Sequence, residues 1–498
     1  MRQIIHVIAP PPTPNGDLHI GHMAGPYLGA DIFARTIRHL GFEPNVVVST
    51  DDHQSYVDTT AQRLGTTAPT LIAKARAEIR ASFDSYGIKL SAFGAIDDRY
   101  CRFVQAFFER LFQRNLVSVR EVDVLFDNQL GCYAVEAFVS GLCRHCLAPA
   151  AGGICEACGQ PNQCTDLMGL DAERFTTRRE PRLVLDLEHF RADLEQRLGV
   201  MRTHRPWLRR LIDALLEKPL APFVLSYKTQ RGIGLGFVGL PDQHLNVWGE
   251  MFPGHIHFLE QAAGSISRID RYIQFLGFDN SYFYVFVHLA LSLAANEAGF
   301  DWPAPEAFIT NQFYNLGNEK FSTSKGHLVW AADLAADFDT DVIRLFLALH
   351  GPEYQEADFS QATFAAEADR LKHDINTLVR CFNDSPHSRL DAAALMDFVA
   401  AMRPECALER YSASNNAHRT VNGIRALAHG PMAGQAGVRD YIPALLCLAL
   451  DPFCPRFASS IRAHFGFTEL SWDALVPAEE NIVLPEFPAH RRSEGGRQ

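Results

Sequence analysis

The amino end of the chain joins a short apolar run, a turn and a helical pattern in that order. Residues 4–9 are largely apolar without regular alternation, which is typical of a strand buried in a parallel sheet. The segment PPPTPNGD follows as a turn, and the helical periodicity of residues 21–40 ends at Gly41. Because a helix that starts directly after such a strand presents its N-terminal dipole to anions, this end of the chain predicts an α/β fold with a phosphate site.

Strand-like and helix-like segments continue to alternate after this point. We expect a strand over residues 45–50 and helices over 55–64, 71–86 and 99–116, then further strands over 245–248 and 272–276. A stretch rich in Cys, Gly and Pro, residues 117–225, lies between the two groups and is predicted to be an insertion. From about residue 365 only helical patterns occur, as in 364–382 and 441–465. The pattern indicates a parallel α/β part followed by an all-α part.

Composition narrows the class of protein. The 498 residues are enough for two to four domains, and 46 basic against 58 acidic residues give a net charge of −12. This sign disfavours a broad basic surface for nucleic acid, although a local basic groove remains compatible with it. The first residues lack the pattern of a secretion signal and no run of about 18 apolar residues occurs, so we expect no membrane segment and a cytoplasmic location.

Four cysteines are spaced as metal ligands. Two CxxC pairs, separated by eight residues, form two hooks that can close a tetrahedral thiolate cage. Such a site with four protein ligands is structural, and we expect one metal ion there. Small buried residues or a redox pair are the alternative interpretations. The predicted ligands are Cys143, Cys146, Cys155 and Cys158.

Two short motifs carry the predicted chemistry. In the first, HIGH, two histidines three positions apart at a helix start can both face a phosphate, and Gly21 leaves room for a flat base. In the second, KFSTSKG, Lys320 and Lys325 lie in a loop flanked by Gly317 and Gly326, which suits a mobile cationic clamp for a triphosphate. An ordinary surface histidine and an ordinary solvated loop are the alternatives for each motif taken alone.

With both motifs, the cysteine insertion and a helical C-terminal part, the sequence resembles class I aminoacyl-tRNA synthetases, most closely the methionyl-tRNA synthetase family. NGDLHIGHM, DDH, FVSGLCRHC, NVWGE and FLGFDNSYFY also match, so the resemblance covers nearly the whole chain. It implies a ligase that uses ATP with Mg²⁺ to convert an amino acid to an aminoacyl-adenylate and then transfers the acyl group to tRNA. It also implies one structural Zn²⁺ and a monomer.

The resemblance implies a division of the chain. A Rossmann-type catalytic domain is split into residues 1–116 and 226–330 by a connective insertion with the zinc knuckle, residues 117–225. A stem-contact segment then covers 331–365, an α-helical domain like those that bind anticodons covers 366–482, and a flexible tail covers 483–498.

The resemblance also assigns residues to roles. Asp51 would hold the substrate ammonium group, with a helix N-cap as its alternative role, and Trp248 would line the amino-acid pocket, with core packing as its alternative. Asp279 would lie near the ribose and Arg231 in the catalytic cleft. The full implied set comprises His19, His22, Lys320 and Lys325 for catalysis; Asn15, Gly16, Gly21, Asp279, Ser322, Thr323 and Ser324 for ATP; Thr13, Asp51, Trp248, His255 and Tyr284 for the amino acid; and Asn376 and Arg380 for tRNA.

Several positions depart from the family pattern. Thr323 replaces the second Lys of the KMSKS motif, and Phe278 replaces a Lys often found before the acidic residue Asp279. In the amino-acid pocket, aromatic and aliphatic positions of the family become Pro11, Thr13 and His255, and a family His becomes Tyr284, which predicts a more polar pocket of different shape. The Trp that stacks on an anticodon base in relatives is missing, which removes a stacking contribution of roughly 1–3 kcal/mol.

Two functions are therefore compatible with the sequence. The first is a divergent methionyl-type tRNA ligase, which explains the full architecture and the retained Asn376 and Arg380. The second resembles the ligases of specialised metabolism that pass the activated acyl group to a small nucleophile, for example a hydroxylated amino acid in hydrazine synthesis, which explains the altered pocket. A non-enzymatic tRNA-binding regulator fits the intact histidines and the cationic loop less well.

Overall fold

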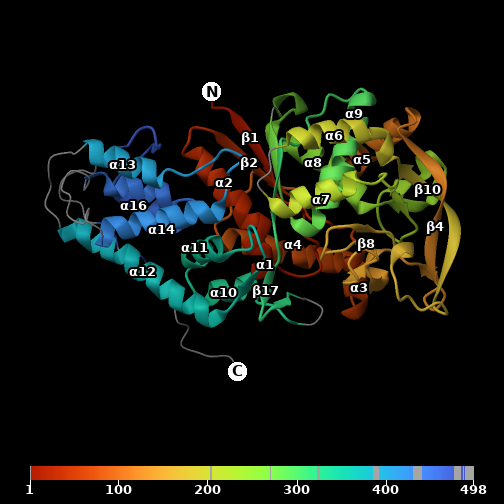
Figure 1. Ribbon diagram of the computed structural model, residues 1–498, viewed down its shortest axis with the longest axis horizontal. Coiled ribbons are helices and arrows are strands. Elements are labelled where there is room, and N and C mark those ends of the chain that lie inside the picture. The colour runs from red at the N-terminus through yellow and green to blue at the C-terminus, as the bar shows by residue number, and fades with distance from the viewer. Residues whose placement is uncertain are drawn as a thin grey trace.

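A parallel five-stranded sheet lies at the centre of the molecule in the computed structural model (Figure 1). The structure describes residues 2–201, 205–269, 271–321, 326–384, 392–429, 440–475, 484–485 and 487. The strand order is β16-β15-β1-β2-β3, and all neighbouring strands are parallel. The strands are β1 Ile4–Ile8, β2 Glu43–Val48, β3 Ala92–Phe93, β15 Tyr272–Gly277 and β16 Ala307–Asn311.

The strand order reverses direction between β1 and β15. The chain moves outward from β1 through β2 to β3, then returns after a long excursion to pair β15 with the other side of β1. Val7 of β1 accordingly pairs with Val46 on one side and Ile273 on the other. In open α/β sheets the crevice beyond the carboxyl ends of the strands at such a switch point is where ligands bind. The predicted α/β fold is confirmed, including the buried first strand.

The expected helix after β1 is interrupted. It begins as α1, Ile20–His22, passes through a π-helical turn at Met23–Tyr27 and continues as α2, Leu28–Arg38. Gly25 has non-helical φ and ψ of −87° and −122°, and Pro26 follows it. Since proline has no N–H group and restricts the residue before it, the regular helix cannot run through this point.

Helices pack against the sheet and are close to the predicted positions. One predicted element is wrong: residues 245–248 are not a strand, because β14 ends at Leu245 and the Asn246 side chain accepts a hydrogen bond from the Trp248 N–H, which caps a helix. The helices of this part are α3 Ser55–Arg63, α4 Ala68–Ser85, α5 Asp98–Gln113, α8 Val247–Ala263 and α9 Leu289–Glu297, with a π-helical segment at Phe283–His288 before α9.

The insertion between α5 and α8 contains antiparallel strands, seen at the right of Figure 1. Long strands β4, Val117–Asp127, and β10, Phe175–Leu185, pair along their whole length. Short strands β5 Cys132–Tyr133 and β11 Phe223–Val224 extend their sheet, and β6 Ser140–Leu142, β7 Pro149–Ala151, β8 Gly153–Ile154 and β9 Pro161–Asn162 form two small hairpins. Helices α6 Arg191–Val200 and α7 Pro206–Leu216 follow, then a small sheet of β12 Ser226–Tyr227, β13 Gly234–Leu235 and β14 Leu240–Leu245.

The C-terminal part is helical, at the left of Figure 1. The predicted helix over 364–382 lies within α12, whereas the pattern over 441–465 is two helices, because Pro452 and Pro455 break it. This part contains α10 Ala331–Asp337, α11 Thr340–His350, α12 Gln361–Asp384, α13 Ala392–Met402, α14 Ala413–His429, α15 Ile442–Leu450 and α16 Pro455–His464. A small sheet joins β17 Tyr314–Leu316 and β18 Glu319–Lys320, which come before α10, to β19 Ala357–Phe359, which lies between α11 and α12.

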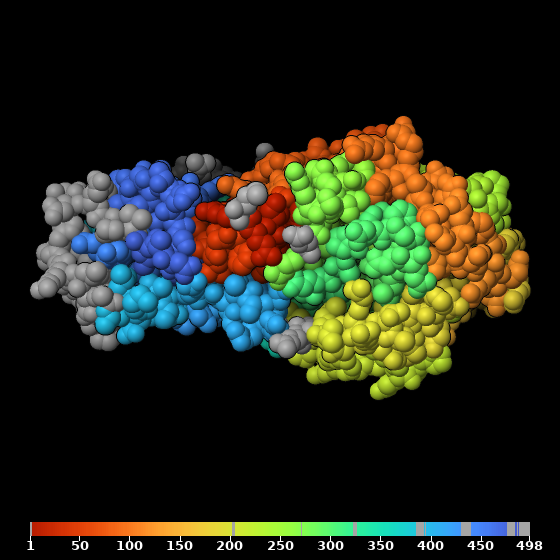
Figure 2. Space-filling view, turned by 90° about the horizontal axis from the view of Figure 1, so that it is seen from above, coloured from red at the N-terminus to blue at the C-terminus, as the bar shows by residue number. Residues whose placement is uncertain are grey.

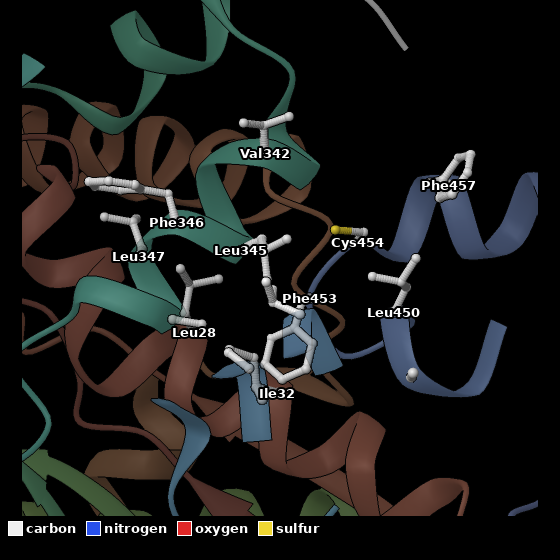
Figure 3. Close-up of a cluster of buried hydrophobic side chains, with 14 of the residues drawn as sticks. Leu28, Ile32, Val342, Leu345, Phe346, Leu347, Leu450, Phe453, Cys454 and Phe457 are labelled. Atoms are coloured by element: carbon white, nitrogen blue, oxygen red, sulfur yellow. The ribbon is translucent and has the colours of Figure 1, made fainter. Parts of the chain in front are cut away.

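One continuous apolar core joins the sheet to the helical part. Figure 3 shows Leu28 and Ile32 of α2 next to Leu345 of α11 and Phe453 of the α15–α16 loop. Seen from above, the N-terminal segment lies between the helical part and the insertion (Figure 2). Among the described helices, none is both long enough and apolar enough to cross a membrane.

Candidate active site

The two histidines of the first motif orient each other at the start of α1. The His19 Nδ1 accepts a hydrogen bond from the His22 N–H at 3.3 Å, and the His22 Nδ1 accepts one from the His19 N–H at 3.4 Å. Their rings stack with centroids 3.7 Å apart. This reciprocal capping holds both imidazoles at one helix end.

The protonation state of both rings follows from this geometry. Burial is the main cause that lowers the pKa of His19 to about 2 and that of His22 to about 4. The charges of His22 and Lys320 contribute to the shift of His19, and the charge of Lys320 contributes to that of His22. Both rings are therefore neutral at pH 7. Because each Nδ1 accepts a hydrogen bond, each Nε2 carries the hydrogen. The pair thus offers two N–H donors at the carboxyl end of β1.

The second motif lies directly against the first. The Phe321 ring stacks on His19 with centroids 4.9 Å apart, and the Ile20 N–H donates to the Val329 carbonyl at 3.0 Å. The Lys320 ammonium lies 4.2 Å from the Phe313 ring centre and forms an ion pair with Glu156 of the insertion. Two motifs about three hundred residues apart in the sequence therefore lie against each other in the fold. Ser322, Thr323, Ser324 and Lys325 lie outside the described residues.

The turn between β1 and α1 leads directly into the first motif. The Asn15 N–H donates to the Thr13 carbonyl at 2.8 Å, and Thr13, Asn15 and Gly16 are half-buried. A Cβ atom added at Gly21 would lie 3.0 Å from the His19 ring and 3.1 Å from Phe321. Gly21 therefore has no room for a side chain, and its bare backbone lets the His19 and Phe321 rings pack closely there.

Asp279 follows β15 at the same edge of the sheet. Burial is the main cause that raises the pKa of its carboxyl to about 6; Lys320 opposes this rise and Glu156 contributes to it. His22, Asp279 and Lys320 therefore come from three separate segments to one polar region next to the switch point.

A second polar cluster surrounds Asp51 beyond the end of β2. Burial raises the pKa of Asp51 well above its usual value, and the nearby carboxylates of Glu250 and Glu136 raise it further. The His53 Nδ1 lies 2.9 Å from both oxygens of Glu250. The Asp51 Oδ1 is buried with no hydrogen-bond partner among the described residues. A cationic ligand would stabilise such a concentration of buried acids.

Asp51 is not a helix cap. The cap of α3 is Gln54, whose side chain accepts from the Ser55 N–H at 2.8 Å. The alternative role considered for Asp51 is therefore excluded. Arg231 lies next to this cluster, where it donates to Asp58 at 2.7 Å and to the Asp52 carbonyl at 2.8 Å.

Trp248 forms one wall of the cluster. Its ring stacks on Phe283 with centroids 4.0 Å apart, and its Nε1–H donates to Glu136 at 2.9 Å. Burial raises the pKa of Glu136 to about 7, although this hydrogen bond and one from Ser55 lower it. Trp248 is only half-buried, so it combines packing with a directed polar contact.

His255 and Tyr284 lie behind Asp51, deep in the α8 and π-helical segments. Both are buried, and their ring centres are 5.6 Å apart. The Gln274 side chain contacts the His255 Nδ1 at 3.3 Å. Burial lowers the pKa of His255 well below its usual value, with His288 as a second cause, so the ring is neutral.

The four predicted metal ligands converge in the insertion. The thiol sulfurs of Cys143, Cys146, Cys155 and Cys158 lie within 4.8 Å of one another, with separations of 3.9 Å and 3.6 Å across the two hooks. A tetrahedral ion with metal–sulfur bonds of about 2.3 Å requires edges of about 3.8 Å. The cage fits one metal ion, and Glu156, which pairs with Lys320, lies inside its second hook.

The two residues matched to anticodon reading differ in access. The Asn376 amide is 7% exposed and bonds the Phe487 backbone twice, accepting from its N–H at 2.7 Å and donating to its carbonyl at 3.3 Å. Arg380 is exposed and donates to Thr377 at 3.1 Å. The structure therefore leaves only Arg380 of this pair accessible.

Sequence reasoning missed four acidic or imidazole groups of the site: His53, Glu136, Glu156 and Glu250. His53 and Glu250 belong to the motifs DDH and NVWGE, so the sequence already marked them as candidate polar groups of the site. No local signal marks Glu136 or Glu156, because their contacts with Trp248 and Lys320 join distant parts of the chain.

The family model for tRNA synthetases class I (M) matches residues 5–381. The chain belongs to this family. Curated relatives include the methionine–tRNA ligases of Porphyromonas gingivalis, 26% identical over 373 residues, and of Methanobrevibacter smithii, 27% identical over 367 residues. Each alignment covers 71% of this chain and 54% of the relative, so the chain spans about half the length of the curated relatives it matches.

A solved structure of this family has the same fold. Methionyl-tRNA synthetase of Mycobacterium tuberculosis in complex with methionyl-adenylate superposes with a TM-score of 0.74 at 18% identity, over 98% of this chain and 99% of that one. The predicted combination of a Rossmann-type sheet, cysteine knuckle and C-terminal helices is confirmed at the level of fold.

Proposed function

We propose that this protein activates an amino acid as an aminoacyl-adenylate. The observation that carries the proposal is the convergence of His19, His22 and Lys320 on one side of a crevice, with the buried acid Asp51 beside it. Neutral donors and a cation suit a polyphosphate, and a buried carboxylate suits an ammonium group. The family relationship supports the same reaction class.

In this reaction the carboxylate oxygen of the amino acid attacks the α-phosphorus of ATP, and the bond to pyrophosphate breaks. The Nε2–H donors of His19 and His22 stabilise charge on the phosphate oxygens as the bond order changes. Lys320 exchanges its contact with Glu156 for the departing pyrophosphate. Asn15, Gly16, Gly21 and Asp279 would hold the adenosine. Ser322, Thr323, Ser324 and Lys325 would bind the phosphates, and Mg²⁺ bound with ATP would supply charge neutralisation.

The proposed amino-acid subsite contains Asp51 as the partner of the α-ammonium group and Trp248 as a wall, with Thr13, His255 and Tyr284 around the side chain. Arg231 positions the Asp51–Asp52 segment through its bond to the Asp52 carbonyl. The test is exchange of labelled pyrophosphate into ATP with a panel of proteinogenic and hydroxylated amino acids. Exchange with at least one of them is expected, and its absence across the panel would refute the proposal.

We propose Zn²⁺ as the ion of the cysteine cage, because four thiolates in tetrahedral positions are its usual structural ligands. The His145 N–H and the Asn162 amide point at the Cys143 sulfur, at 3.3 Å and 3.4 Å. Such outer hydrogen bonds orient thiolates around a metal.

For the acceptor, the family relationship supports tRNA, with residues 331–365 as the stem-contact segment and Arg380 near the anticodon. A small-molecule acceptor is the second candidate, and two observations favour it. The Asn376 amide makes two hydrogen bonds to the Phe487 backbone, so it is not available to bind a tRNA base. The insertion also contains a cavity of about 190 Å³ lined by Phe283, which stacks on Trp248, and by Ala214 and Lys218.

Two assays on the same purified protein distinguish a tRNA acceptor from a small-molecule acceptor. Acylation of total tRNA is measured beside formation of amides from small amines and amino acids, and of hydroxamates or O-acyl esters from N-hydroxylated amino acids, with release of AMP in each case. The variant A214W fills the wall of the cavity. If the acceptor is a small molecule bound there, A214W lowers product formation at least tenfold while pyrophosphate exchange is retained. Unchanged product formation would exclude the cavity.

A further inference from the structure

The space next to the Asp51 carboxylate is small. A cavity of about 10 Å³ lies there, and its lining includes Pro11, Asp51, Tyr100, Met251 and His255. A cavity of this size has room for about one water molecule. If Asp51 holds the α-ammonium group, little volume remains for the rest of the substrate.

Met251 lines this cavity, and Tyr284 packs against Met251. They are 5% and 0% exposed, and the Met251 sulfur lies 4.0 Å from the Tyr284 hydroxyl. The Tyr284 ring is in turn 4.6 Å from the ring of His288, which is also buried. A long substrate side chain would have to displace this packed group, and protein interiors accept extra volume only at a cost in free energy.

The cavity wall also carries a polar group. His255 is neutral, and its Nδ1 is the atom that faces the Gln274 amide, so its Nε2 carries the hydrogen. This Nε2 is buried and has no hydrogen-bond partner among the described residues. A substrate oxygen can accept from it, whereas a thioether or an alkyl chain is a poor partner or none.

We infer that the amino acid activated here has a side chain no larger than the hydroxymethyl group of serine, and is not methionine. Glycine, alanine and serine fit this class, and serine alone among them offers an oxygen to the His255 Nε2–H. The inference rests on the proposed adenylation, because it assigns the substrate of the same site.

The test compares pyrophosphate exchange with glycine, alanine, serine and methionine. One of the three short amino acids is expected to give a kcat/KM at least tenfold above that of methionine. The variant M251A, which shortens a side chain that lines the cavity, is expected to raise exchange with methionine at least tenfold relative to the short amino acids. The matched control M396A alters an exposed methionine of α13 and leaves the order unchanged. Methionine as the best substrate of the unmodified protein would overturn the inference.

A binding measurement separates failure of this inference from failure of the proposed function. Calorimetry compares non-hydrolysable sulfamoyl analogues of glycyl-, alanyl-, seryl- and methionyl-adenylate. Tighter binding of a short analogue without any exchange would support the substrate class and contradict the proposed reaction. Tighter or equal binding of the methionyl analogue would overturn the substrate class, and binding of none of the four would overturn both.

Discussion

His19 and His22 act as a pair because each ring accepts the other's backbone N–H. This arrangement fixes the tautomer and directs both Nε2–H groups away from the helix, so their donor function does not depend on protonation at pH 7. Their low pKa values predict that activity between pH 6 and 8 does not follow titration of these rings.

Replacing His22 by Ala is expected to slow pyrophosphate exchange about 10²-fold or more, the scale of one lost transition-state donor. The fold should persist, since the variant loses one capping contact worth about 1 kcal/mol. Exchange rates and thermal unfolding check the two parts, with His418→Ala on the surface of α14 as control. Equal rates in H22A and the unmodified protein would remove His22 from the mechanism.

Glu136 makes stability depend on pH. Its pKa rises from an ordinary 4.5 to about 7 on folding, so the folded state binds the extra proton and stability falls as pH rises through this window. The variant E136Q keeps an oxygen for Trp248 and carries no charge. Its free energy of unfolding should exceed that of the unmodified protein by up to about 3 kcal/mol at pH 8 and by much less at pH 5.

Urea unfolding at both pH values checks this expectation. The control E78Q changes a partly exposed glutamate of α4 that pairs with Lys74, and its stability difference from the unmodified protein should not grow between pH 5 and pH 8. A constant difference between E136Q and the unmodified protein at the two pH values would contradict it.

The sequence predicts the role of a residue where a reactive side chain stands in a short motif with a fixed spacing. The positions of His19, His22 and the four cysteines follow from short spacings in the sequence. The choice between a cap and a buried acid at Asp51 could not be made from sequence, because both are common for Asp before a helix. It depends on Gln54 taking the cap.

At the scale of elements, the cysteine knuckle links metal binding to the candidate active site. Glu156, which lies in its second hook, forms an ion pair with Lys320. Gly159, directly after this hook, lies close to the ring of Phe278, the neighbour of Asp279. A loosened knuckle would therefore disturb both sides of the nucleotide crevice.

Metal analysis of the purified protein is expected to give one zinc per chain. The variant C146S should lose the ion and slow pyrophosphate exchange, since three ligands no longer close the cage. C132S is the matched control, because Cys132 lies in β5 outside the cage and should retain the ion. Full zinc content in C146S would refute the assigned ligands.

Element boundaries were predictable where apolar periodicity had no competitor, as in β1 and α12. They failed where a single residue overrides periodicity. Asn246 converts an apolar run into a helix start, and Pro452 and Pro455 divide a helical pattern. The π-helical turn at Gly25 and Pro26 also follows from local backbone chemistry.

At the scale of the whole molecule, contacts between distant segments create the crevice. Lys320 and Glu156 are 164 residues apart. A single sequence identifies each partner as charged, but it does not show which opposite charges meet after folding. For this reason the two motifs could be predicted from the sequence. The roles of Glu136 and Glu156 and the small cavity next to Asp51 could not.

Arg344 of α11 joins the sheet to the helical part. Its side chain is 0% exposed and donates to Asp31 of α2 at 2.7 Å, to the Tyr86 carbonyl at 3.0 Å and to the Phe453 carbonyl at 3.1 Å. Replacement by Ala leaves buried acceptors without a donor, so R344A should lower the free energy of unfolding by about 3–5 kcal/mol.

Chemical unfolding measures this loss against R370A, which removes an exposed ion pair within α12 worth less than about 1 kcal/mol. R344K keeps the charge but not the planar fork that reaches four acceptors, the Pro452 carbonyl at 2.6 Å included, so it should recover only part of the stability. Because Arg344 contacts segments from both parts, the loss should appear as one cooperative transition at lower urea. Separate early unfolding of the helices alone would show that Arg344 does not couple the two parts.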